Sequence, residues 1–263
     1  MFKNVSDTVT VLVSVFALLF SFGTTYFSSK RDKKQDIKNL RSDLRSILQR
    51  LASLPKENFE LSQNYAANPQ AIAALSSSIA QENALLARQA AEIARNLPAG
   101  KVSSTEHYCI ALALQNCFNN EQAIEFLERG LKVADDFNDE IALLRVYGNL
   151  LFITGQYEAG RAKYLESLNV FAKYKGYNDY TQKSTHIWTE LAWAASESGS
   201  GFGNLASQHI VSAGNYAQAM MPGQYTDQLK KQINQAQMQM NFGRPHSAAG
   251  NISPGVSAKS EIS

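Results

Sequence analysis

An uncharged, mostly apolar run extends from Thr8 to Phe27, with the sequence TVTVLVSVFALLFSFGTTYF. A helix of about 20 residues rises about 30 Å, which matches the hydrocarbon core of a bilayer. The hydroxyl side chains in the run can hydrogen-bond to the preceding helical turn, so they are compatible with insertion. The run therefore predicts a transmembrane helix within an anchor of residues 1–29. Its apolar members include Val9, Leu12, Phe16, Leu19 and Phe27.

A basic cluster at Lys30–Lys34 follows this run, whereas the N-terminal flank carries only Lys3, offset by Asp7. The positive-inside rule places the basic flank, and the large domain after it, in the cytoplasm. The cluster also suits anionic lipid headgroups, at about 1 kcal/mol for each basic residue. The position of the basic cluster beside the predicted bilayer explains its charge, so we predict no nucleic-acid partner. The alternative is a cleaved signal peptide, with Ser21 and Gly23 at the cleavage site, but a basic cluster directly after the run opposes translocation.

The next segment is a heptad pattern in which apolar residues alternate at spacings of three and four. They are Ile37, Leu40, Leu44, Ile47, Leu51 and Leu54. One narrow apolar stripe on a helix is unstable in water, so it predicts a helical stalk or coiled coil. Its partner is either a second copy or a later helix of the same chain. Pro55 is expected to end this helix, because the residue before a proline avoids the helical region.

A second stalk helix is predicted from Pro69 to Leu97. Asn68 is a suitable N-cap, and a proline is favoured in the first helical turn. The segment is rich in alanine, glutamine and glutamate, which are strong helix formers. The break at Pro98–Lys101 ends it. We therefore predict a stalk of residues 30–97, followed by a separate domain.

After Ser103 the periodicity changes to pairs of shorter helices. The clearest motif is GQYEAG at Gly155–Gly160, followed by Tyr164, and a related motif, FNNEQA, occupies Phe118–Ala123 and is followed by Leu127. Both resemble the tetratricopeptide repeat (TPR), with glycine in place of some of its alanines; a weaker third unit covers residues 188–213. The resemblance implies an all-α fold in which residues 98–237 form a short TPR-like α-solenoid.

The resemblance also implies roles for individual residues. Those that pack the two helices of a repeat together are Ala123, Leu127, Gly160 and Tyr164. The first helix of each repeat would line a partner-binding groove, at Tyr108, Leu112, Gln115, Asn116, Arg145, Asn149 and Phe152. In TPR proteins that bind extended peptides, a basic residue and an asparagine hold the peptide carboxylate and backbone. Arg145 and Asn149 match these two positions, and the other basic positions of that clamp are not matched.

Composition and chemistry add exclusions. The net charge of +2 indicates no class of partner. Cys109 and Cys117 would lie about 12 Å apart on one helix, too far for a disulfide, so we expect free thiols buried in that helix. Acidic residues between positions 135 and 140 are expected to cap helices. No metal-ligand spacing, phosphate loop or nucleophile motif occurs, so we predict no catalytic residue, metal or cofactor. Residues 238–263 are small and polar and predict a disordered tail.

Together these patterns predict an interaction scaffold, not an enzyme. It would be a single-pass membrane protein whose groove binds a protein or peptide partner. The alternative is a structural homo-oligomer, or a subunit of a membrane complex, assembled through the stalk. A sensor that relays a ligand signal across the membrane is a third hypothesis, disfavoured because residues 1–7 are too few for a ligand-binding domain.

The apolar run predicts that the protein fractionates with membranes and is released by detergent, not by high salt. Burial of apolar side chains in a bilayer does not depend on ionic strength, unlike attachment through surface charges. Membranes washed with salt and then extracted with detergent provide the measurement, and recovery of the protein in the salt wash would contradict the anchor.

Protease added to intact cells should leave the large domain uncut.

Overall fold

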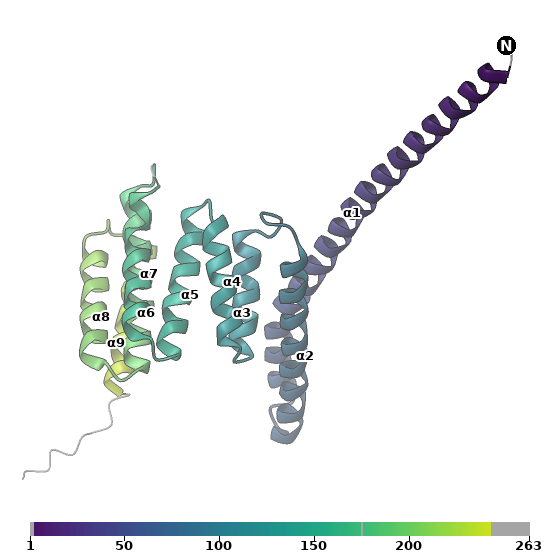
Figure 1. The fold of residues 1–263 in the computed structure, drawn as a ribbon. Coiled ribbons are helices and arrows are strands. Elements are labelled where there is room, and N and C mark those ends of the chain that lie inside the picture. Colours follow the sequence, from purple (N-terminus) through teal and green to yellow (C-terminus); the bar gives the residue numbers. More distant parts are fainter. Residues whose placement is uncertain (1–2, 175, 243–263) are drawn as a thin grey trace, which may run out of the picture. The chain divides into compact units, whose positions relative to one another are not determined.

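The computed structural model describes the backbone of residues 3–174 and 176–242, and side chains within residues 33–174 and 176–239. The described residues form helices and no strand, which confirms the expected all-α class (Figure 1). The α-helices are α1 (Lys3–Asn64), α2 (Pro69–Asn96), α3 (Ser104–Asn116), α4 (Asn120–Val133), α5 (Phe137–Ile153), α6 (Tyr157–Asn169), α7 (Asp179–Gly199), α8 (Gly203–Gln218) and α9 (Gln224–Phe242). A short 3-10 helix occupies Val170–Ala172.

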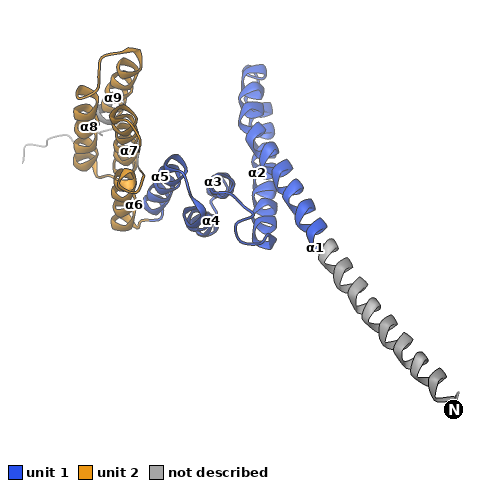
Figure 2. Cartoon of the chain, turned by 90° about the horizontal axis from the view of Figure 1, so that it is seen from above, with its two compact units in different colours: residues 1–154 blue, residues 155–263 orange. Residues whose placement is uncertain are grey.

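The chain divides into two compact units, residues 1–154 (unit 1) and residues 155–263 (unit 2), coloured separately in Figure 2. Helices α1 to α5 lie in unit 1 and α6 to α9 in unit 2. The break at Pro98–Lys101, which the sequence marked as a boundary, is a connection inside unit 1, because α2 packs against α3 on its other side.

The apolar stripe of α1 packs against helices of its own chain. Leu44 is fully buried, and Ile37, Leu40, Ile47 and Leu51 are partly buried against the same core. The face that α2 contributes consists of small residues, Ala87, Ala90, Ala91 and Ala94, which allow the helices to approach closely. Of the two partners left open by the sequence, the structure shows the one within the chain.

The prediction that α1 ends before Pro55 is wrong, because the helix continues to Asn64 with the proline inside it. A proline removes one backbone hydrogen bond and costs about 3 kcal/mol or more in a helix interior. Side chains connect the helix across this position: Arg50 pairs with Glu57 on the far side of the proline, and its Nε lies 2.7 Å from Glu82 Oε1 of α2. These ion pairs are partly exposed and contribute little by themselves. Leu54, next to the proline, is 3% exposed, and its burial favours continuation of the helix.

The helices of unit 1 stack in one repeated order. Helix α1 packs on α2, α2 on α3, α3 on α4 and α4 on α5, while α1 contacts α3 and α3 contacts α5. The fully buried side chains of this stack include Ile110, Leu114, Phe126, Leu127, Leu143 and Leu150. The α1–α2 hairpin is thus the first pair of the stack, where the sequence predicted a separate stalk.

Capping residues fix the helix ends in unit 1. Ser103 and Glu106 form a capping box at the start of α3, with each side chain bonded to the other residue's backbone N–H. Asp136 caps α5 by accepting the N–H two residues later at 2.7 Å. Asp139 accepts a hydrogen bond from Thr105 of α3 at 3.0 Å. The acidic residues between positions 135 and 140 therefore include a helix cap, as expected, and a link between α3 and α5.

In unit 2, α7 and α8 form a helix pair, and α9 packs against both. The core includes Ile187, Ala194, Ile210, Ala213, Leu229 and Ile233. Trp188 is 40% exposed, whereas Ile187 and Ala194 of the same helix are buried. The indole N–H of Trp188 donates to Tyr225 of α9 at 3.3 Å.

Two predicted segments lie at the edges of the described part. Helix α9 continues to Phe242, past the predicted start of the tail at Met238, and residues 243–263 lie outside the described residues. Within the described residues, no helix is long and apolar enough to cross a membrane. The side chains of the predicted span Thr8–Phe27, and of Lys30 and Arg31, lie outside those residues, so the anchor stays a prediction.

Gly130 of α4 provides a test of the stacking. A Cβ there would lie 2.8 Å from Leu143 Cδ2 and 3.1 Å from His107 Cβ. Because Leu143 is fully buried, it has little room to move. Overpacking costs about 1–3 kcal/mol and the gain in helix propensity returns at most about 1 kcal/mol. Gly130→Ala should therefore lower the free energy of unfolding by about 1 kcal/mol in chemical denaturation.

Gly214 of α8 is the matched control, since no atom lies within 4 Å of a Cβ built there. Gly214→Ala should raise the free energy of unfolding by about 0.5–1 kcal/mol, because alanine is the better helix former. Opposite signs are expected for the two substitutions. Equal stabilisation by both would contradict the close approach at Gly130.

Candidate functional site

A cavity of about 430 Å³ opens between α1, α2 and α3, all within unit 1. We call it the α1–α2–α3 groove. Its lining residues are Leu48, Leu51, Ala52, Leu54, Pro55 and Asn58 of α1, Ser76, Ile79, Ala80 and Asn83 of α2, and Cys109, Leu112, Ala113 and Asn116 of α3.

The groove is apolar with a few hydrogen-bonding groups. None of its lining residues is charged. Ser76 donates a hydrogen bond to Asn58 Oδ1 at 3.1 Å, which links α2 to α1. The Asn83 amide donates to Cys117 Sγ at 3.4 Å, which links α2 to the end of α3. Apolar walls with a few polar groups are typical of sites that bind an apolar side chain and orient the molecule to which it belongs.

The predicted partner-binding residues do not all meet in one place. Leu112 and Asn116 line the groove. Tyr108 and Gln115 are half-buried on α3 and are not among its lining residues. Phe152, expected to face a partner, is only 3% exposed. A large apolar side chain lowers the free energy most when water is excluded from it, which explains its packing inside the molecule.

Arg145 and Asn149 of α5 are half-buried and interact with groups of their own chain. Burial raises the pKa of the Tyr108 hydroxyl above its ordinary value, Cys109 acts in the same direction, and Arg145 acts against them. Arg145 therefore lies close enough to α3 to act on Tyr108 electrostatically. The role of Arg145 and Asn149 in holding a peptide stays a prediction.

The two cysteines are free thiols, but the expectation that one helix buries both is wrong. Helix α3 ends at Asn116, so Cys117 lies in the following turn. Cys109 is exposed and lines the groove. Desolvation by its surroundings raises the pKa of the Cys109 thiol, and the nearby Glu106 and Asp139 carboxylates act in the same direction. Cys109 is therefore a poor nucleophile at neutral pH.

The residues predicted to pack the helix pairs are buried: Ala123, Leu127, Gly160 and Tyr164. In unit 2, Tyr164 stacks on Trp193 with ring centroids 5.5 Å apart, and its hydroxyl lies 2.8 Å from Ser196 Oγ. Arg161 Nε lies 2.7 Å from Glu197 Oε1, whose side chain is only 1% exposed. These contacts join α6 to α7 as internal packing.

Sequence reasoning missed the α1 and α2 walls of the groove. Leu51 and Leu54 belong to the heptad stripe, and Ile79 belongs to the apolar pattern of the second helix. Their spacing shows that they face another helix, but it does not show which helix. Only the fold-back of α1 onto α2 and α3 turns these positions into one surface.

The groove can hold apolar side chains and offer amide hydrogen bonds. Within the described residues, no group of three or more histidine, cysteine, aspartate or glutamate side chains could hold a metal ion. The comparisons with known proteins leave this description as it stands: no family model, curated protein or solved structure matches the chain.

Proposed function

We propose that this chain is an interaction scaffold that binds a protein partner in the α1–α2–α3 groove, and that the predicted Thr8–Phe27 anchor holds it at a membrane. The observation that carries the proposal is the groove itself, an apolar cavity of about 430 Å³ walled by three helices. A cavity of this size accepts a few apolar side chains, and the amides of Asn58, Asn83 and Asn116 can bond to the backbone that presents them.

An exposed aromatic ring near the groove supports a protein partner. Phe118 follows α3 shortly after the groove residue Asn116; it is 91% exposed and has a positive φ of 59°. A positive φ is unfavourable for a bulky side chain, so the turn holds an apolar ring in solvent at a conformational cost. A partner that covers the end of α3 would remove this ring from water.

The alternative, an oligomer assembled through the stalk, is less well supported. Such an oligomer would form by burial of the apolar stripe of α1. That stripe instead packs against α2 and α3 of the same chain. A second copy would have to displace these helices to reach Leu44, which is fully buried.

Leu112→Glu tests the proposal, because a carboxylate in the apolar groove opposes an apolar side chain of a partner. Cross-linked complexes captured with the full chain should contain proteins that the variant loses. Leu165→Glu is the matched control: it makes the same change on α6, where Leu165 is 54% exposed and is not a lining residue of the groove. We expect a loss of at least about tenfold in recovery for Leu112→Glu alone, since one desolvated contact contributes about 1–3 kcal/mol.

Leu165→Glu should keep its helical circular dichroism and thermal midpoint, since surface changes usually alter stability by about 0.5 kcal/mol. Leu112 is half-buried, so Leu112→Glu should lower the thermal midpoint, and capture is compared at a temperature at which its helical circular dichroism matches that of the wild type. The same set of proteins captured by the wild type, Leu112→Glu and Leu165→Glu would rule out the groove as the binding site.

A further inference from the structure

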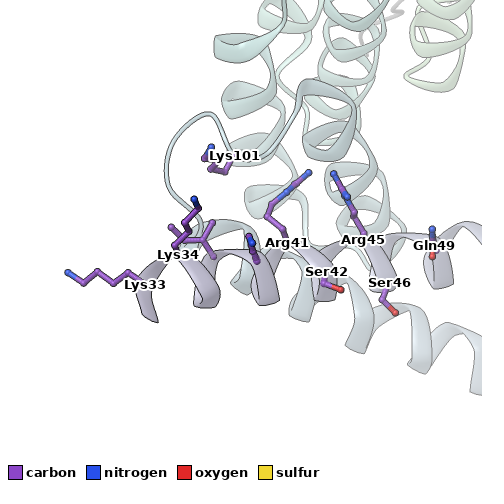
Figure 3. A pocket seen from close by; sticks show the side chains of 10 residues that line it. Lys33, Lys34, Arg41, Ser42, Arg45, Ser46, Gln49 and Lys101 are labelled. Carbon is purple, nitrogen blue, oxygen red and sulfur yellow. The ribbon is translucent and has the colours of Figure 1, made fainter. Parts of the chain in front are cut away.

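A second cavity, of about 870 Å³, lies beside residues 33–49 of α1 and is lined mainly by cations (Figure 3). We call it the basic cleft. Its cations are Lys33, Lys34, Lys38, Arg41, Arg45 and Lys101. Its other lining residues are Ile37, Ser42, Ser46 and Gln49, so no carboxylate is among them.

Two separate segments supply these charges. Arg41 and Arg45 project from α1 on the side of the α2–α3 connection, where Lys101 faces Lys34 (Figure 3). Like charges from separate segments repel each other, so this arrangement does not stabilise the fold by itself. Neutralisation by a bound anion would relieve the repulsion.

Most of these cations have no ion-pair partner among the described residues. Arg41 pairs with Glu106 at 2.7 Å, which fastens α1 to the start of α3. Within the described residues, no ion pair involves the other five cations of the cleft. All five, Lys33, Lys34, Lys38, Arg45 and Lys101, are also exposed. They are therefore available to a ligand, whereas Arg41 has a structural partner.

The length of the cleft bears on the ligand. From Lys33 to Gln49 the helix rises about 24 Å. The headgroup layer of one bilayer leaflet is only about 5–8 Å thick, so lipid headgroups would reach only one end of a helix that leaves the membrane. Grooves that bind single-stranded nucleic acid add aromatic side chains for base stacking, and the lining of this cleft contains none. An elongated polypeptide with carboxylates can follow the whole row.

We propose that the basic cleft binds an acidic peptide segment of a protein partner. Carboxylates of the peptide pair with Lys34, Lys38, Arg45 and Lys101. Ile37, which is partly buried, provides the apolar floor. This surface is separate from the α1–α2–α3 groove, so either site can fail without the other.

The test is fluorescence anisotropy with the purified full chain and a labelled peptide of alternating glutamate and serine, long enough to extend over about 24 Å. The same peptide with glutamine in place of glutamate is the charge control and should not bind measurably. Lys38→Gln combined with Arg45→Gln should weaken binding of the acidic peptide at least about tenfold, since charge-assisted hydrogen bonds are the strong ones.

Lys230→Gln combined with Lys231→Gln is the matched control, because it removes the same charge from exposed positions of α9. It should change the affinity by less than about twofold, because neither lysine lines the cleft. Leu112→Glu should likewise leave this binding intact, which separates the cleft from the groove.

Equal weakening by the two double variants would overturn the proposal, because it would show attraction to net charge alone. Absence of binding by the wild type would overturn it too. The same variants are tested with a labelled single-stranded DNA and with vesicles of phosphatidylserine. If binding of either depends on Lys38 and Arg45 more strongly than binding of the peptide does, the ligand is not an acidic peptide.

Discussion

The fold of unit 1 depends on how the apolar stripe of α1 is covered. Leu44 is fully buried, and its neighbours in the stripe are partly buried against the alanine face of α2 and the inner face of α3. Burial of one leucine contributes about 1.5–3 kcal/mol, so a stripe of six residues is too costly to leave in water. The alanines of α2 leave room for the larger side chains of α1. This pairing makes the α1–α2 hairpin the first layer of the helix stack and builds both candidate surfaces.

The two surfaces divide residues 33–58 of α1 between them. The turns from Lys33 to Gln49 carry cations of the basic cleft, and the turns from Leu48 to Asn58 carry the apolar wall of the α1–α2–α3 groove. The connection between α2 and α3 contributes Lys101 to the cleft, and α3 contributes Leu112 to the groove. One helix therefore presents an electrostatic surface and an apolar surface in series. A partner with an acidic segment beside an apolar one would match this order of surfaces.

Local patterns were sufficient to predict part of this fold. The stripe from Ile37 to Leu54, the N-cap Asn68 and the helix pairs after Ser103 all follow from spacing and capping chemistry. Properties that depend on distant contacts were not predictable. The continuation of α1 through Pro55 is an example, since Leu54 beside the proline is buried by the rest of the fold.

The candidate groove shows the same limit. The resemblance to the TPR pointed to Leu112 and Asn116, which line the groove, and their binding role stays a prediction. Leu51 and Ile79 could not be predicted, since an apolar stripe reveals that it is covered but not what covers it. The packing of α1 onto its own chain is therefore the feature that the sequence left open, and both surfaces depend on it.

The most direct test of this packing compares the free energies of unfolding of Leu44→Ala and Leu85→Ala. Both are measured at several protein concentrations, with the oligomeric state determined in parallel. Leu44 is fully buried and Leu85 of α2 is 57% exposed. We expect Leu44→Ala to lower the free energy of unfolding by about 2–5 kcal/mol, independently of concentration and without a change in oligomeric state. Leu85→Ala should change it by about 0.5 kcal/mol or less. If Leu44→Ala instead dissociates an oligomer and leaves the stability of the helix stack unchanged, the stripe pairs with a second copy and the account is wrong.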